Sequence, residues 1–350
     1  MSYIDEVKSG VLNWLETVRV DDGWGKWKLN AMQNPRPYDM MCSVDAISIL
    51  KILGELDSVE QYKKDQAISF FQSCQDSSDG YFKDPTITPA DYLGTHKEED
   101  IWAHNAVVEQ ALRSLGAVPL YKLPQKSFVD LDEIEPCEWI LSQDWTNPWL
   151  SGERFHRVVS SYIRKKGGVV DPYNDVKLNR LFEAYEHYVH DPATGMPIKG
   201  GCKDPSYAMA GLFKAVRANF ESGRRVLDME RAVDYVLALQ HSDGEFGMRE
   251  NMCINWDSLW ILIEFDKRLG KEKYRHNDIY KAIDLTAEML LNDYRKDDGG
   301  FAFHKKTCAT LVHSVRASES YPISDTIGTS MCLTCLQYAD EWKKQSAVIS

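Results

Sequence analysis

The 350-residue sequence lacks any apolar run long enough to span a bilayer. Its first residues, MSYIDEVKSGVLNWLETV, carry acidic side chains early and show no small-residue cleavage site after an apolar segment. They therefore do not resemble a signal peptide. We expect a cytoplasmic protein without a membrane span.

The sequence also lacks an excess of positive charge. Its net charge is −12 and its pI is about 5.3, and SYIRKKGG is a single short basic run. Binding to nucleic acid or to an anionic membrane depends on clustered Lys and Arg. These two classes of main partner are therefore excluded, and a small molecule or an oligosaccharide is expected instead.

Paired cysteines are scarce as well. The chain has eight Cys, and only Cys332 and Cys335 form a C-x-x-C pair, without a second Cys or His pair at zinc-site spacing. Most of the others lie in apolar segments, which is typical of small core residues in a reducing compartment. Phosphate-binding Gly-rich loops, EF-hand loops and G-x-S-x-G motifs are missing too, so we expect no metal and no cofactor.

Strand-like alternation is nearly absent, whereas a helical repeat is prominent. An apolar helix ends in Gln or a charged residue, Asp-Gly and an aromatic residue follow, and a second apolar helix comes after a loop. In AVDYVLALQ, Val233, Val236, Leu237 and Leu239 mark one helical face. The clear copies have their turn glycines at Gly23, Gly80, Gly195, Gly244 and Gly299.

The spacing of these glycines indicates one further, degenerate copy. The steps between them are 57, 115, 49 and 55 residues, and the long step is close to twice the others. The segment CEWILSQDWTNPWLSGERFHRVVSSYI fits the gap, with Asp144, Trp145 and Trp149 in place of the turn residues. Six helix pairs result.

Six pairs predict an all-α fold in which the chain, residues 1–350, forms a single (α/α)6 toroid domain. The second helix of each pair is more apolar, as SLWILI and TSMCLTCL show. We therefore expect it in an inner ring, with the first helix of each pair outside. Residues 116–135 are expected to be an extended connection.

The Gln, Asp-Gly, aromatic signature in QDSSDGYF and QHSDGEFG resembles the repeats of the terpenoid cyclase and protein prenyltransferase toroid family. The resemblance covers nearly the whole chain and implies a toroid fold. Protonating cyclases of that family carry D-x-D-D at an inner helix, and PISDTIGTSM matches it only at Asp325 and Thr326. Of the three zinc ligands of the prenyltransferases only Cys253 is kept, since Asn251 and Gly328 stand at the other two positions.

In a toroid, the loops before the inner helices open on one end of the central cavity. Polar and aromatic residues recur at the start of all six inner helices, and we expect them to converge on one site. They are Tyr38, Asp39, Glu99, Asp100, Trp102, His104, Glu153, Arg154, His156, Asp204, Tyr207, Asn255, Trp256, Asp257, Tyr321, Asp325 and Thr326.

Helix capping is the competing interpretation of these positions. Asp, Ser and Asn at helix starts accept free backbone N–H groups, which stabilises a helix by about 1 kcal/mol each. Asp204 before Pro205 favours this interpretation. Capping does not account for the accompanying Trp, Tyr and His residues, and their recurrence favours a binding cavity.

The number of ionisable groups favours a sugar over a carbocation or an isoprenoid, whose sites need aromatic faces with few neutralising groups. We predict a carbohydrate-active enzyme, a glycoside hydrolase or a lyase, with Asp100 and Asp257 as acid and base. Glu99 and Asp325 are reserves, and His104 and Arg154 orient the substrate. Trp102, Tyr207 and Trp256 form a sugar platform.

Three alternatives remain open at this point. A lyase would take its base from His156 or Tyr207, with Arg154 neutralising a uronate carboxylate. A different enzyme class, a terpene cyclase or prenyl-transfer enzyme, is supported by the resemblance. A noncatalytic toroid that binds a ligand or a protein is the third possibility.

Overall fold

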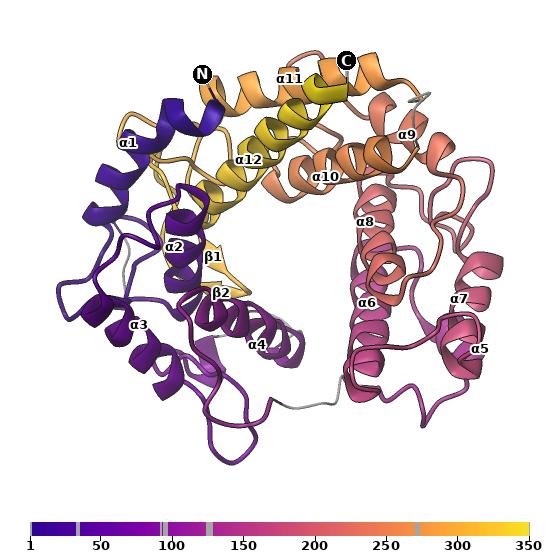
Figure 1. The fold of residues 1–350 in the computed structure, drawn as a ribbon, viewed down its shortest axis with the longest axis horizontal. Coiled ribbons are helices and arrows are strands. Elements are labelled where there is room, and N and C mark those ends of the chain that lie inside the picture. The colour runs from indigo at the N-terminus through magenta and orange to yellow at the C-terminus, as the bar shows by residue number, and fades with distance from the viewer. Residues whose placement is uncertain are drawn as a thin grey trace. The chain divides into compact units, whose positions relative to one another are not determined.

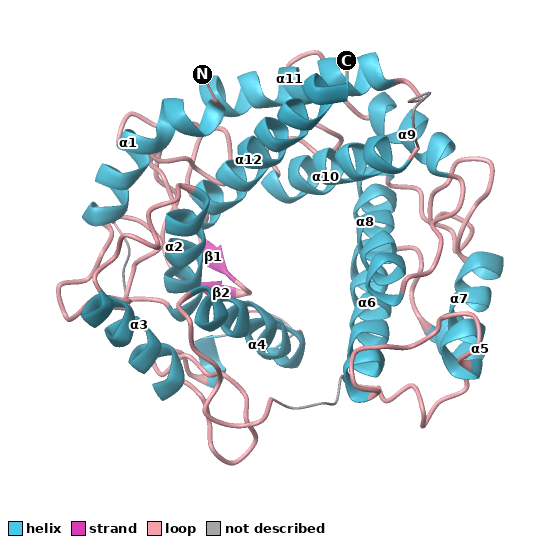
Figure 2. Ribbon diagram, in the orientation of Figure 1, coloured by secondary structure: helices cyan, strands magenta, loops and turns pink. Residues whose placement is uncertain are grey.

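The computed structural model describes residues 2–32, 36–91, 93, 97–123, 129–269 and 274–349. These residues are mostly helical, and the strands among them form a single two-stranded sheet (Figures 1 and 2). No helix in these ranges is long and apolar enough to cross a membrane.

The chain divides into two compact units, residues 1–124 with 287–350 and residues 125–286. The first unit contains α1 (Tyr3–Thr17), α2 (Met40–Ile52), α3 (Gln61–Ser73), η1 (Pro89–Asp91), α4 (Lys97–Ser114), η2 (Leu290–Tyr294), β1 (Leu311–Val312), β2 (Val315–Arg316) and α12 (Thr326–Ile349). The second contains α5 (Pro136–Ser142), α6 (Pro148–Lys165), α7 (Val176–Tyr188), α8 (Pro205–Ser222), α9 (Met229–Ala238) and α10 (Met252–Arg268). Helix α11 (His276–Met289) begins in the second unit and ends in the first.

The second helices of the predicted pairs pack on one another within each unit. In the first unit α2 contacts α4 and α12, and in the second α8 contacts α6 and α10. Helix α8 buries apolar or small residues along its whole length, whereas α7 buries only one face. The more apolar helices therefore form the inner layer of each unit, as their sequences predict.

The five predicted turns are present and share one geometry. Their glycines, Gly23, Gly80, Gly195, Gly244 and Gly299, all have positive φ. In each turn a residue one to three positions after the end of the first helix forms an isolated antiparallel bridge, as Gln240 does with Phe246. At Gly195 a side chain is excluded by space as well, because an added Cβ would lie 2.7 Å from the Asp228 carbonyl oxygen.

A hydrogen bond ties each of four turns to the inner helix that follows it. The backbone N–H of the aromatic residue after the turn donates to a polar side chain of the inner helix, about one helical turn from the start of that helix in three cases and about two turns at Asn105. The pairs are Trp27 with Ser43 at 3.0 Å, Phe82 with Asn105 at 3.0 Å, Phe246 with Asn255 at 2.8 Å and Phe301 with Thr329 at 2.9 Å. This bond satisfies a buried donor that no helix or sheet would pair.

The degenerate copy around Asp144 replaces this turn with other bonds. The Trp145 indole N–H donates to the Ile140 carbonyl at 2.8 Å, and the Ser151 hydroxyl donates to the Asp144 carbonyl at 2.6 Å. The two side chains connect the end of α5 to the start of α6. A sixth hairpin therefore forms without the glycine turn.

In the second unit α6 and α8 pack on each other, and they overlap in the view of Figure 1. A Cβ added at Gly211 would lie 2.6 Å from the Pro148 Cβ, and one at Gly152 would lie 3.0 Å from the Gly211 carbonyl. Two small residues thus let the backbones approach, and this approach brings charged side chains of α6 and α8 together.

Candidate functional site

A cluster of charged side chains occupies the face that α6, α8 and α10 share in the second unit. Glu153 accepts from Arg157 Nε at 2.7 Å and from Lys214 Nζ at 3.2 Å. Arg217, one turn after Lys214 on α8, interacts electrostatically with Asp257 of α10. We call Glu153, Arg157, Lys214, Arg217 and Asp257 the charged cluster.

Asp257 has fewer hydrogen-bond and ion-pair partners than Glu153, the other carboxyl group of the charged cluster. It is only 2% exposed, and none of the described residues donates a hydrogen bond to it. Burial raises its pKa to about 7, and the charge of Glu153 adds to the rise, while Lys214 and Arg217 oppose it. Near neutral pH this group therefore exchanges a proton.

Whereas the pKa of Asp257 is raised, that of Glu153 is lowered. Burial acts to raise its pKa, but Lys214, Arg157 and His156 together hold that pKa well below its ordinary value. The carboxylate stays ionised at every working pH. Two neighbouring carboxyl groups with opposite shifts are the usual arrangement for a proton donor and a charged partner.

Aromatic rings lie beside the charged cluster. Phe213 contacts Trp256 at 5.6 Å and Trp260 at 5.0 Å between ring centroids. Lys214 Nζ lies 4.9 Å and the Arg217 guanidinium 5.6 Å from the Phe213 ring. Trp256, a predicted platform residue, is half-buried and keeps its indole N–H without a partner among the described residues.

His156 and Arg154 extend from the same helix as Glu153. His156 is buried and its Nε2 lies 2.8 Å from Glu221 Oε1 of α8. Arg154 is half-buried. Both are close to the cluster in sequence, and the His156 contact fixes α6 against α8.

Asp204 and Tyr207 stand at the start of α8. The Asp204 carboxylate is exposed and accepts from the backbone N–H of Ser206 at 2.8 Å and of Tyr207 at 3.2 Å, which is a helix cap. The Tyr207 ring packs edge-on against Trp149 of α6 at 5.8 Å. The pair forms a half-exposed aromatic contact between two inner helices.

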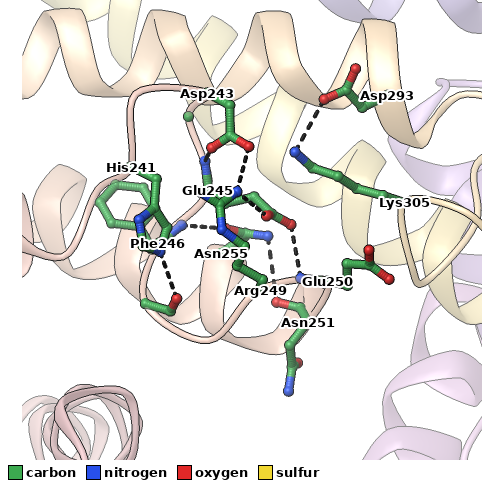
Figure 3. A network of polar contacts seen from close by, with 12 residues as sticks. His241, Asp243, Glu245, Phe246, Arg249, Glu250, Asn251, Asn255, Asp293 and Lys305 are labelled. Carbon is green, nitrogen blue, oxygen red and sulfur yellow. Dashed lines mark hydrogen bonds and ion pairs between the residues drawn. The ribbon is translucent and has the colours of Figure 1, made fainter.

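Asn255 belongs to the turn rather than to the charged cluster. It is fully buried, its Oδ1 accepts from Phe246 N–H, and its Nδ2 donates to the Asn251 carbonyl at 3.4 Å (Figure 3). Figure 3 also shows the acids of the same loop paired locally, with Arg249 bound to Asp243 and Glu245. The polar start of α10 thus serves the fold at Asn255 and leaves Asp257 for another use.

In the first unit Asp39 is a fully buried cap. Its carboxylate accepts from Met41 N–H at 2.8 Å and Cys42 N–H at 3.3 Å and pairs with Arg36 at 2.7 Å. Burial and the nearby Asp84 raise its pKa to about 6, against Arg36. The side chain holds the start of α2.

Asp325 is the corresponding cap of α12. It accepts from Gly328 N–H at 2.7 Å, Phe303 N–H at 2.8 Å and Ala309 N–H at 2.9 Å. Burial raises its pKa to about 6 although these bonds lower it. Tyr321, half-buried, lies in the loop that Asp325 organises, and its N–H and carbonyl both bond Cys308.

Tyr38 lies apart from Asp39, in an open cleft of about 490 Å³ beside α3. Its ring packs edge-on against Phe70 at 5.4 Å, and Lys26 Nζ lies 5.0 Å from its centroid. Trp24 and Gln66 also line the cleft. Tyr38 and Asp39 are adjacent in sequence, but their side chains therefore lie in different surroundings.

His104 of α4 is 2% exposed and packs edge-on against His313 at 4.9 Å. Burial, and then His313, lower its pKa, so the ring stays neutral. Glu99, Asp100 and Trp102 lie on the first turns of α4, and their side chains are outside the described residues. Their predicted roles stay predictions.

Lys214 and Arg217 were missed by the sequence reasoning. A signal was present, because both cations interrupt the apolar inner helix YAMAGLFKAVRANF. Charged residues on a helix that is otherwise buried need a partner or a ligand.

Cys253, one turn before Asp257, is the one matched zinc ligand. Burial, and then Asp257, raise the pKa of its thiol to about 12, so it stays protonated. Within the described ranges no group of three or more His, Cys, Asp and Glu is arranged to hold a metal ion.

Comparison with known proteins gives structural matches only, because no family model and no curated protein sequence matches the chain. An α-1,6-mannanase of Salegentibacter sp. HEL1_6, in an inactive variant bound to α-1,6-mannotetrose, matches with a TM-score of 0.50 at 8% identity over 97% of this chain and 99% of the mannanase. A polysaccharide lyase matches with a TM-score of 0.44 at 11% identity over 99% of both chains. A family 88 glycosyl hydrolase from Bacteroides vulgatus matches at 0.44 and 10% over 97% of this chain and 98% of that one. The likeness to the mannanase shows the fold, and the predicted all-α class of paired helices, the alpha-alpha toroid class, is confirmed.

Proposed function

We propose that the protein is a carbohydrate-active enzyme, a glycoside hydrolase or a lyase, whose proton donor is Asp257. The observation that carries the proposal is a pair of carboxyl groups with opposite pKa shifts, Asp257 of α10 and Glu153 of α6, on two inner helices that both pack on α8. The fold shared with an enzyme that acts on a mannan supports it. No cofactor is invoked.

In a hydrolase the protonated Asp257 gives its proton to the oxygen of the leaving sugar. Its pKa of about 7 suits this task, because the group holds a proton near neutral pH and yields it readily. The ionised Glu153 stabilises the positive charge that develops at the anomeric carbon. A water molecule adds to that carbon and releases a proton, which replaces through solvent the one that Asp257 gave up. Trp256 and Tyr207 are the sugar-stacking residues of this proposal.

Asp100 remains the sequence-based candidate for the second carboxyl group. A comparison of Asp100→Asn with Glu153→Gln distinguishes the two assignments, since only the partner of Asp257 is needed for turnover. In the lyase version Asp257 or His156 moves the proton, and the product carries a new carbon–carbon double bond that absorbs in the ultraviolet.

The test is the Asp257→Asn variant assayed on a panel of oligosaccharides. Turnover should fall by about 10³-fold, within the range that a positioned acid contributes, while the far-ultraviolet circular dichroism stays unchanged. Full turnover by a folded Asp257→Asn variant contradicts the assignment. The matched control is Asp204→Asn, which keeps the cap of α8.

The isoprenoid alternative is supported by the repeat resemblance and by the contiguous rings of Phe213, Trp256 and Trp260. Lys214 and Arg217 already lie over the Phe213 ring. Because they would repel a further positive charge, they argue against a carbocation at this ring. Binding of a prenyl diphosphate, measured by calorimetry with and without a divalent metal, distinguishes this alternative.

We also keep the proposal that residues 1–350 act as one domain. Separate expression of residues 125–286 tests it. A fragment that unfolds cooperatively with the melting temperature of the whole chain contradicts a single domain.

A further inference from the structure

The charged cluster carries more positive than negative charge. Arg157, Lys214 and Arg217 face one permanently ionised carboxylate, Glu153, and a second carboxyl group, Asp257, that is partly protonated at neutral pH. Glu153 already receives both Arg157 and Lys214. The balance of the cluster is therefore positive although the chain as a whole is acidic.

Arg217 is the cation that this cluster does not neutralise. It forms no ion pair with any described residue. Its interactions with Asp257 and with Glu221 are electrostatic and longer in range, and Glu221 is itself bonded to His156. A half-buried guanidinium without a carboxylate partner costs desolvation free energy unless an anion arrives.

Phe213 holds the two cations of α8 in place. Lys214 and Arg217 both lie within 5.6 Å of the centroid of its ring, which is fixed in turn by Trp256 and Trp260. An arginine that stacks on a ring keeps its fork of N–H donors free for an anion. The ring therefore positions these cations for a ligand.

We propose that the substrate is an acidic saccharide, and that Arg217, assisted by Lys214, binds its carboxylate or sulfate group beside Asp257. This inference rests on the proposed function, because it names the substrate class of the same site. The cations lie on α8 and the proton donor lies on α10, and the packing of these two helices fixes the distance between them. Neutral sugars lack the group that this arrangement binds.

The experiment compares three probes on the whole chain: an oligogalacturonate, the same oligosaccharide as its methyl ester, and a sulfated oligosaccharide. Turnover and binding by calorimetry are both measured. The wild-type protein should prefer one or both anionic probes over the methyl ester, and the two anionic probes tell carboxylate from sulfate. Their binding should weaken as salt is added.

The variants are Arg217→Gln, Arg217→Lys and, as a matched control, Arg225→Gln. Arg225 is an exposed arginine of the same unit. Arg217→Gln should raise KM for the preferred anionic probe by about tenfold, equivalent to about 1.4 kcal/mol, and leave KM for the ester within about twofold. Arg217→Lys should recover part of the loss, and Arg225→Gln should change neither value.

The outcomes separate the two proposals. The acidic-substrate proposal is overturned if the wild-type protein uses the methyl ester equally well or better, or if Arg217→Gln affects both probes equally. Neither result contradicts the proposed enzyme activity. Binding of an anionic probe that depends on Arg217, without turnover of any saccharide, overturns the enzyme and supports the anion site. Neither binding nor turnover of any probe overturns both.

Discussion

Buried aspartates near the start of an inner helix have different surroundings in the two units. The first unit has Asp39 and Asp325, and the second has Asp257. Asp325 receives three backbone N–H groups, and Asp39 receives two and an arginine. Asp257 receives none from the described residues. Asp39 and Asp325 therefore stabilise loops and helix ends. Asp257 has no such role among the described contacts, and we propose that it exchanges a proton.

The comparison teaches that burial by itself does not identify a candidate acid. Burial raises the pKa of Asp39 and Asp325 to about 6 and that of Asp257 to about 7. The difference lies in what contacts each carboxyl group. Substitutions at these positions should therefore change different properties, stability in the first unit and turnover in the second.

The largest expected effect is on turnover. Asp257→Asn should lower kcat by about 10³-fold and leave the melting temperature the same or higher, because the change removes a buried ionisable group that forms no described hydrogen bond. Steady-state kinetics and differential scanning calorimetry of the same preparation measure both. A lower melting temperature with unchanged kcat would assign Asp257 to the fold.

Asp325→Ala should have the largest effect on stability. Three backbone donors lose their acceptor, and each costs about 1–3 kcal/mol when left unpaired, so we expect a loss of about 4 kcal/mol in the free energy of unfolding. Urea denaturation followed by tryptophan fluorescence measures it. Asp204→Ala, which removes an exposed cap, is the control and should cost about 1 kcal/mol.

Gly211→Ala should have a smaller effect that links the fold to the charged cluster. The added Cβ would meet Pro148 at 2.6 Å, and separating α6 from α8 costs about 1–3 kcal/mol. The Glu153–Lys214 pair spans the same two helices, so KM should rise as well. An unchanged unfolding midpoint would show that the two backbones are not in close contact.

The pH dependence of stability should change as well, and its sign is diagnostic. The pKa of Asp257 in the folded state, about 7, lies above the ordinary aspartate value of 3.8, so the folded state keeps a proton that the unfolded state loses. This group therefore makes stability fall as pH rises from about 4 to about 7 and has no further effect above that range. The groups that act on it are Lys214 and Arg217 of α8 and Glu153 of α6, and Asp257 in turn raises the pKa of the Cys253 thiol on its own helix.

The wild-type protein and Asp257→Asn should accordingly differ in slope between pH 4 and pH 7 and run parallel above pH 7.5. Urea midpoints at a series of pH values test this. Asp39 and Asp325 titrate in part of the same range in both proteins, so the difference between the two curves isolates Asp257. Parallel curves throughout would contradict the raised pKa.

The fold could be predicted from the sequence because every level of the repeat agrees. Apolar periodicity marks the helices, and the Asp-Gly turns require positive φ, which all five glycines have. The hydrogen bond from four of the turns to the next helix has a sequence signal as well, a polar residue in the first turns of that helix. These residues are Ser43, Asn105, Asn255 and Thr329.

The candidate site could be predicted only in part, because helix caps and the proposed catalytic acid all lie near the start of an inner helix. Asp204, Asp39 and Asp257 look alike in sequence, and only their contacts separate them. Arg217 became a candidate once its distance to Phe213 was known. That distance depends on the conformation of the Arg217 side chain over the ring, which the apolar periodicity of the helix does not predict.

The central claim is that the Asp257 carboxyl group holds a proton near neutral pH. It is tested most directly by a carbon-detected NMR titration of protein with ¹³C-labelled aspartate carboxyl groups, with Asp257→Asn used to assign the resonance. The account predicts a titration midpoint near pH 7. A midpoint near pH 4, the ordinary value for aspartate, would contradict it.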